Sequence, residues 1–140
     1  MTPPRSELQF RDVAQHALAF LIDRGFACAI ANDLQVRYES SKVFIDILHG
    51  VQDCEVHIIF GRLRTQERYS FELFLKLVDP ALEKSLGDRM ATTAESVATT
   101  VSAVVSALKS QGQQIINGDD DVFERMKDVR WWHFCPEALE

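Results

Sequence analysis

The chain has 140 residues, of which 46% are hydrophobic and 26% charged, and its 15 Lys and Arg against 21 Asp and Glu leave a net charge of −6. These proportions are typical of a globular protein with a sizeable core and exclude a disordered chain. The acidic balance disfavours nucleic-acid binding, because negative charge repels the phosphate backbone.

The sequence carries no sign of membrane insertion or export. No apolar run approaches the roughly 20 residues that a bilayer crossing needs, and the start, MTPPRSELQF, lacks the apolar core of a secretory signal. We therefore expect one cytoplasmic domain over residues 1–140 that does not bind membranes. The three cysteines form no CxxC pair, which indicates neither a disulfide framework nor a zinc site.

The first part of the chain predicts one helix and one weak strand. Residues 6–24 carry apolar side chains at helical spacing, Ser6 and Gln9 form a capping-box pattern, and Gly25 ends the helix. The segment 27–31 (ACAIA) is a first strand, weakened by its alanines. A polar turn follows it.

The middle of the chain predicts an antiparallel meander. Strands over 34–39, 42–49 and 54–62 alternate in polarity and are joined by links of a few residues. Such short links require neighbouring strands to run antiparallel, because a parallel crossover needs a dozen or more residues. With the first strand, the sheet has three to four strands.

The last part of the chain predicts helices. A short helix covers 71–78, a long one runs over about 90–116 with a capping box from Thr92 and Glu95, and the last begins at the acidic run 119–121. The long helix carries an apolar stripe made of Val97, Val101, Val104, Val105 and Leu108. The order helix, meander, helices predicts an α+β fold with helices packed on the sheet.

The predicted strands have two unlike faces. The clean face is apolar and consists of Leu34, Val36, Tyr38, Val43, Ile45, Ile47, Cys54, Val56, Ile58 and Phe60. The mixed face combines charged and apolar side chains, namely Arg37, Glu39, Phe44, Asp46, Leu48, Glu55, His57 and Ile59. If the helices all cover the clean face, we expect the mixed face to be exposed to a protein partner or a second copy. If one helix crosses over, the apolar part of the mixed face is ordinary core.

A search for catalytic chemistry finds no nucleophile elbow, phosphate loop, dinucleotide fingerprint or zinc-protease motif. His49, Asp53 and His57 lie near one hairpin, but His49 follows the clean face and His57 the mixed face, which argues against a shared metal. Cys54 and His57 also point to opposite faces, so they do not form a nucleophile and base. We expect no catalytic residue, no metal and no cofactor.

Other charged and aromatic groups have local explanations. Arg62, Arg64 and Arg68 are expected to pair with the domain's own carboxylates, and the acids of 119–121 suit a helix start. Asp46 with Glu55 is expected to be a solvated or salt-bridged pair. Of the adjacent tryptophans, one closes the core and the other is a candidate interface residue. The candidate partner-binding residues are Arg37, Phe44, Asp46, Leu48, Glu55, His57, Ile59, Asp119, Asp120, Asp121 and Trp131.

Four segments give the chain a family resemblance: GFACAIANDLQVRYESSKVFIDILHG, EVHIIFGRL, RYSFELFLKLVDP and NGDDDVFERMKDVR. Their order resembles small bacterial immunity proteins of polymorphic-toxin and contact-dependent inhibition systems. The resemblance implies a non-enzymatic protein that binds a toxin domain and occludes its active site. The alternatives are a secretion-chaperone-like homodimer that holds an effector segment, and a small enzyme or ligand-binding domain.

Overall fold

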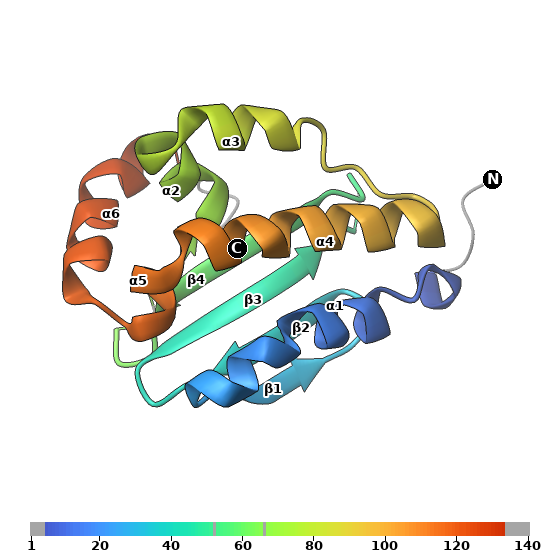
Figure 1. Cartoon of the computed structure of the whole chain (residues 1–140), viewed down its shortest axis with the longest axis horizontal. Coiled ribbons are helices and arrows are strands. Elements are labelled where there is room, and N and C mark those ends of the chain that lie inside the picture. Colours follow the sequence, from blue (N-terminus) through green and yellow to red (C-terminus); the bar gives the residue numbers. More distant parts are fainter. Residues whose placement is uncertain (1–4, 52, 66, 134–140) are drawn as a thin grey trace.

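The computed structural model describes residues 5–51, 53–65 and 67–133, and the side chains of residues 5, 6 and 129–133 lie outside this description (Figure 1). It confirms the predicted α+β class, because a helical segment precedes an antiparallel sheet and further helices follow it. In chain order, with η for 3-10 helices, the elements are η1 (Arg5–Leu8), α1 (Phe10–Leu18), η2 (Ala19–Arg24), β1 (Ala27–Ala31), β2 (Gln35–Glu39), β3 (Val43–His49), β4 (Val56–Arg62), β5 (Tyr69–Ser70), α2 (Phe71–Val78), α3 (Pro80–Leu86), α4 (Ala94–Gln111), α5 (Gln113–Asn117) and α6 (Asp120–His133).

The sheet is an antiparallel meander whose spatial order, β1–β2–β3–β4–β5, is the chain order. Asn32 and Ser40 form its first two turns, since each side chain accepts hydrogen bonds from the backbone N–H groups two and three residues later, at 2.9–3.1 Å. The strand β5 was not predicted. It consists of only two residues paired with Ile59 and Phe60, too few to leave an alternating pattern in the sequence.

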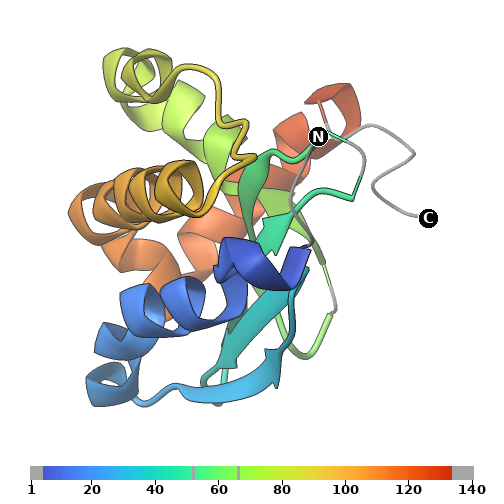
Figure 2. The same ribbon diagram turned by 90° about the vertical axis from the view of Figure 1, so that its right-hand side faces the viewer.

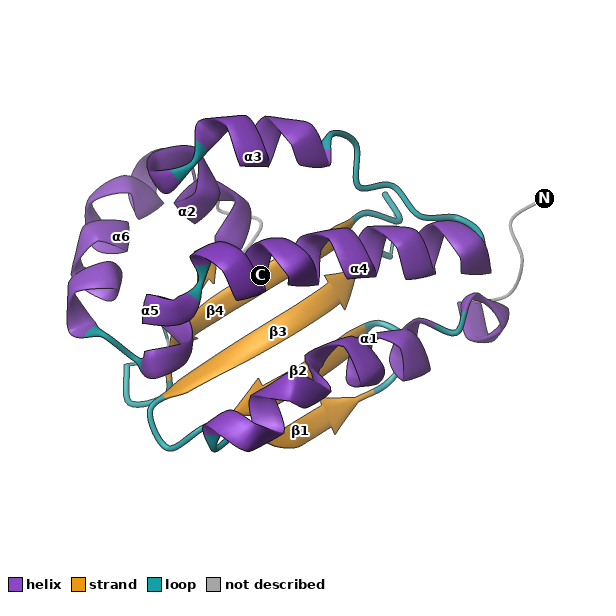
Figure 3. Cartoon of the chain, viewed as in Figure 1, coloured by secondary structure: helices purple, strands orange, loops and turns teal. Residues whose placement is uncertain are grey.

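The helices α1 and α4 pack side by side over one face of the sheet (Figures 1 and 2). Figure 3 shows both of them in front of the strands. The covered face is the predicted clean face, whose buried members are Val36, Tyr38, Val43, Ile45, Ile47, Val56, Ile58 and Phe60. All five residues of the predicted α4 stripe are buried as well, so apolar burial between helices and sheet holds the domain together.

The N-terminal helix is shorter than predicted. Gln9 has φ 60° in the left-handed region and caps nothing with its side chain, so α1 begins at Phe10 instead of after Ser6. From Ala19 the helix tightens into η2, which ends at Gly25 with φ 88° as predicted. The predicted start of this helix after Ser6 is therefore wrong.

The long C-terminal helix is also divided. Thr93 and Ser96 form the capping box of α4, with each side chain accepting from the other's backbone N–H at 2.9–3.0 Å, in place of Thr92 and Glu95. The preceding residues are extended instead of helical, because Ala91 donates to the carbonyl of Cys54 at 2.8 Å. Gly112 lies between α4 and α5, and a Cβ there would lie 2.6 Å from the carbonyl oxygen of Leu108, so the position has no room for a side chain.

The last helix, α6, places Phe123 and Met126 in the core, both with 0% exposure. Phe123 packs against Phe60 and Tyr69 with ring centroids 5.8 and 6.4 Å apart. The prediction that one of the adjacent tryptophans closes the core concerns side chains outside the described part of the chain. Among the helices of the described residues, none has the length and apolar character needed to cross a bilayer.

Candidate functional site

The strand register gathers the residues predicted for the mixed face on one side of the sheet. Arg37 lies opposite Asp46, and Asp46 lies opposite Ile59, along one row across β2, β3 and β4. In the next row Leu48 lies opposite His57. Directly opposite residues share a face, so the mixed face exists as predicted.

The exposure of the mixed face differs from the expectation. Asp46 is fully buried and Phe44 is 3% exposed, whereas Arg37, Leu48 and Ile59 are half-buried. The expectation that an uncovered mixed face exposes Phe44 and Asp46 is wrong, because side chains of the same face lie against them. Neither residue offers free surface to a partner. Both contact the side chain of Arg37 and fix its position.

Asp46 anchors a polar network at the centre of this face. Its carboxylate accepts two hydrogen bonds from Arg37, at 2.7 Å from Nε and 2.8 Å from Nη2, and a third from Gln35 at 3.2 Å. This bidentate geometry is the strong form of an Arg–carboxylate pair, and the hydrogen bond to Asp46 raises the pKa of Arg37. The guanidinium also stacks 4.1 Å above the ring of Phe44. Arg37 is therefore held in one orientation.

A second polar cluster lies where β4 begins. His57 Nδ1 lies 2.7 Å from Glu72 Oε1, and its Nε2 lies 3.6 Å from Glu55 Oε1. Arg89 donates to the other oxygen of Glu72 at 2.7 Å. The hydrogen bond to Glu72 raises the pKa of His57 against the opposing effect of burial, and the charges of Glu72, Glu55 and Asp53 add to this rise.

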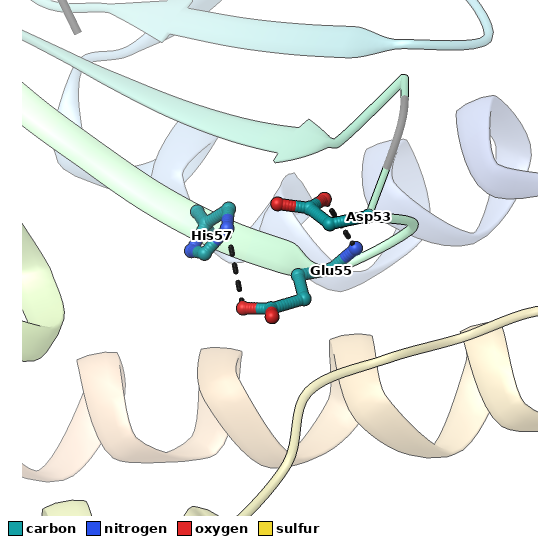
Figure 4. A group of neighbouring side chains, drawn as sticks. All are labelled: Asp53, Glu55 and His57. Atoms are coloured by element: carbon teal, nitrogen blue, oxygen red, sulfur yellow. Dashed lines mark hydrogen bonds and ion pairs between the residues drawn. The ribbon is translucent and has the colours of Figure 1, made fainter. Parts of the chain in front are cut away.

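Figure 4 shows the side chains of Asp53 and Glu55 beside His57, with the His57–Glu55 ion pair drawn. One donor atom from each of these three residues lies within 4.8 Å of the other two. Sequence reasoning missed this set because it grouped His57 with His49. It also missed Glu72, which belongs to α2.

His49 is separate from this cluster. It is 1% exposed on the clean face, with Nε2 2.8 Å from the carbonyl oxygen of Ala91 and its ring stacked on Phe10. The His49, Asp53 and His57 combination therefore does not converge on one point, as the opposite strand parity indicated. Cys54 precedes β4 with φ 56° and its backbone bonds to Gly50 and Ala91.

The third polar cluster surrounds Arg62. Its guanidinium, 5% exposed, contacts Glu67 at 2.9 Å, Asp120 at 3.3 Å and Glu124 at 3.2 Å. The prediction that Arg62 pairs with the domain's own carboxylates is confirmed. Burial by itself would raise the pKa of Glu67, but hydrogen bonds from Arg62 and Tyr69 lower it below its ordinary value.

Only part of the acidic run 119–121 takes part in these contacts. Asp120 pairs with Arg62 and, at 3.7 Å, with Arg64, while Asp119 and Asp121 are exposed beside it. The run is thus partly used inside the domain. The predicted interface residue Trp131 has its side chain outside the described part of the chain.

A hollow of about 400 Å³ adjoins Arg37 on the mixed face. It is lined by Arg37, Glu39, Phe44, Leu63 and Arg68. The Nε of Arg68 is buried and has no hydrogen-bond partner among the described residues. The backbone of Glu67 passes close by, because a Cβ on Gly61 would overlap its carbonyl oxygen and lie 2.7 Å from a ring carbon of Phe44. The guanidinium groups of Arg37 and Arg68 suit an acidic side chain of a partner, although the carboxylate of Glu39 also lines the hollow.

A second hollow, of about 600 Å³, lies between α1 and α4 on the helical side. Asp12 and His16 line it from α1, and Ser102, Ser106 and Lys109 line it from α4. These polar groups are exposed, and no described hydrogen bond joins one helix to the other across the hollow. The mixed face, with its fixed hydrogen bonds, is therefore the stronger candidate site.

No family model matches the chain, and no curated protein or solved structure matches it either.

Proposed function

We propose that this protein is a non-enzymatic protein-binding module that contacts its partner with the mixed face. Its most suitable form is an immunity-like protein of the cytoplasm that neutralises a toxin domain by occlusion. The observation that carries the proposal is the half-buried Arg37, held by the fully buried Asp46 beside a hollow that contains a second arginine. Arginines in such fixed positions are enriched among the residues that dominate binding energies.

Preorganisation favours this function. A side chain that is already fixed loses little conformational entropy when a partner binds, so more of its contact energy appears as affinity. Leu48 and Ile59 add half-buried apolar area next to it. Around this centre the charges differ in sign, with Arg37 and Arg68 at one end and Asp53 and Glu55 at the other. This pattern orients a partner of complementary charge.

The net charge of −6 adds a long-range effect. A negative protein attracts a basic partner and speeds the encounter at low salt. The acids that serve this attraction include the exposed Asp119 and Asp121 at the start of α6. A basic toxin domain that also presents an acidic side chain to Arg37 and Arg68 fits both the net charge and the local pattern.

The test is a comparison of captured proteins from native lysate by mass spectrometry. The interface variant is Glu39→Lys with Glu55→Lys. Both side chains lie at the edge of the mixed face, and each is about one-third exposed, so a partner can reach them. The matched control is Asp23→Lys with Glu95→Lys, which makes the same charge change on exposed sites of η2 and α4. We expect wild type and control to retain a partner that the interface variant loses. Equal capture by all three folded proteins would contradict the proposal.

A second candidate is the secretion-chaperone-like homodimer, favoured by the edge strand β1. Within the described sheet β1 pairs with β2 alone, and Ala27, Cys28 and Ala29 are exposed and uncharged. Cys28 is an exposed free thiol on this edge. An uncharged edge is a template for a second strand. An irregularity between Cys28 and Ile30 interrupts the ladder and weakens this template.

Light scattering after size-exclusion chromatography separates the two candidates. A dimer that an Ala29→Lys substitution on β1 converts to a monomer supports the homodimer. A monomer at micromolar concentration contradicts the homodimer and leaves the occluding protein as the proposal.

A further inference from the structure

We propose that Asp53, Glu55 and His57 form a binding site for a divalent transition-metal cation, with Zn²⁺ as the best match. This cation site shares Asp53 and Glu55 with one end of the mixed face, but cation binding does not depend on the proposed protein-binding function. It lies at one end of that face, where the chain enters β4.

The geometry needs little adjustment to hold a cation. Zinc bonds to nitrogen and carboxylate oxygen are about 2.0–2.2 Å long, which places the donor atoms roughly 3–3.6 Å apart. His57 Nε2 and Glu55 Oε1 are already 3.6 Å apart. Figure 4 shows the carboxylate of Asp53 on the same side of the histidine ring, and all three donor atoms lie within 4.8 Å of each other. A cation between them requires small side-chain rotations only.

An independent observation comes from the other nitrogen of His57. Its Nδ1–H donates to Glu72 at 2.7 Å, which fixes the ring orientation and directs Nε2 toward Glu55. Arg89 in turn holds Glu72 at 2.7 Å. Metal-binding histidines almost always donate their second N–H to a carboxylate or carbonyl in this way. Glu72 belongs to α2 and Arg89 to the connection before α4, so this support is built by tertiary structure and not by the local loop.

The charges also favour a cation. Glu72 is neutralised by Arg89. Among the described side chains, Glu55 forms an ion pair with His57 alone, and Asp53 has no cationic partner within ion-pair distance. A cation takes the place of the Nε2 proton of His57, and two carboxylates beside the resulting neutral imidazole leave a charge of −2, which a divalent cation balances. The side chains of Glu55 and His57 are 33% and 30% exposed, so an ion reaches them from solvent.

The donor set selects the class of cation. One imidazole and two carboxylates suit Zn²⁺ and, more weakly, Mn²⁺, whereas Ca²⁺ takes six to eight oxygen ligands. Three protein ligands leave room for water or for a group from another molecule. We therefore expect the affinity order Zn²⁺, Mn²⁺, Ca²⁺.

The test is titration calorimetry of the full chain with Zn²⁺ and, separately, with Mn²⁺, which binds thiols weakly. We expect one saturable equivalent for wild type. His57→Gln, which keeps a hydrogen-bond donor toward Glu72, should weaken Zn²⁺ binding by at least about tenfold, and Glu72→Gln should weaken it by about 10–100-fold. Asp53 lies on an exposed loop, so Asp53→Asn should weaken cation binding without changing the melting temperature of the metal-free protein. His16→Gln, an exposed histidine on α1, should leave the affinity unchanged.

Amide NMR locates the ion directly. Substoichiometric Mn²⁺ should broaden signals of residues 53–57 first, followed by those near 72 and 89. Two results would overturn the site: no saturable binding of either ion to wild type, or broadening centred elsewhere, such as residues 119–121. Equal affinity of wild type and a folded Asp53→Asn, His57→Gln double variant would do the same.

Discussion

Arg37 on β2 donates two hydrogen bonds to the fully buried carboxylate of Asp46 on β3, at 2.7 and 2.8 Å. The pair spans adjacent strands in direct register. Removing one partner from a buried pair leaves an uncompensated charge, which is more costly than replacing both partners by apolar groups. The stability of the mixed face should therefore depend on both residues together.

The first prediction concerns Asp46→Ala. We expect this variant to lower the free energy of unfolding by about 3 kcal/mol, because Arg37 loses the carboxylate that compensates its charge. Urea unfolding followed by circular dichroism measures the change. The double variant Arg37→Met, Asp46→Leu should recover most of the loss, since it removes both charges.

The matched control is Glu39→Gln. Its carboxylate is 3.5 Å from Arg37 and one-third exposed, so we expect a change below about 0.5 kcal/mol. A loss for Asp46→Ala as small as that of the control would mean that the buried pair contributes little.

The second prediction is a pH dependence from Glu67. Its pKa in the folded state is lowered, so its contribution is present above the unfolded pKa of about 4.3 and is lost as pH falls through the folded value. Wild type should be more stable than Glu67→Gln by about 2 kcal/mol at pH 7. Urea midpoints between pH 7 and 3 should show this difference shrinking below about pH 4.5. A difference that stays constant over that range would contradict an ionic role, and Glu95→Gln, an exposed carboxylate on α4, serves as control.

The third prediction concerns the close approach at Gly61. Gly61→Ala places a Cβ into the backbone carbonyl of Glu67 and against the ring of Phe44. Because backbone has little freedom to move away, we expect a loss of about 3 kcal/mol. Gly25→Ala is the comparison, since no atom lies within 4 Å of its Cβ and only its φ of 88° is unfavourable. That variant should lose about 1–2 kcal/mol, and a smaller loss at Gly61 than at Gly25 would refute the contact.

The fourth prediction tests where α4 begins. Thr93→Ala removes the side-chain oxygen that accepts from Ser96 N–H at 3.0 Å and should cost about 1 kcal/mol. Thr92→Ala, one residue earlier, should change stability by less than about 0.5 kcal/mol. Thermal unfolding of the two variants is sufficient, and the reverse order of effects would place the cap at Thr92.

The two faces of the sheet were predictable from the sequence, because alternate residues of a strand point to opposite faces. Leu34 and Cys54 are the exceptions on the clean face, and both lie just outside the paired strands, where parity no longer fixes the side-chain direction. The Arg37–Asp46 pair also left a usable signal. Both residues are equidistant from the turn between Ser41 and Lys42, so a symmetric hairpin brings their opposite charges together.

The helix boundaries and the His57 cluster were harder to predict. Two adjacent threonines satisfy the capping pattern before α4. The choice between them depends on the extended segment at Ala91 pairing with Cys54, which is a long-range contact. Glu72 and Arg89 likewise reach His57 only after α2 and the segment before α4 pack beside β4. Hydrophobic periodicity carries no information about such contacts.

The chain His57–Glu72–Arg89 links three segments that are distant in sequence. Each member satisfies the charge or hydrogen-bonding capacity of the next, so a change at one position leaves a neighbour without its partner. During evolution, replacement of Glu72 by an uncharged residue should therefore accompany replacement of Arg89, and often of His57. Positions 57, 72 and 89 should co-vary in related sequences, whereas the exposed positions around them drift independently.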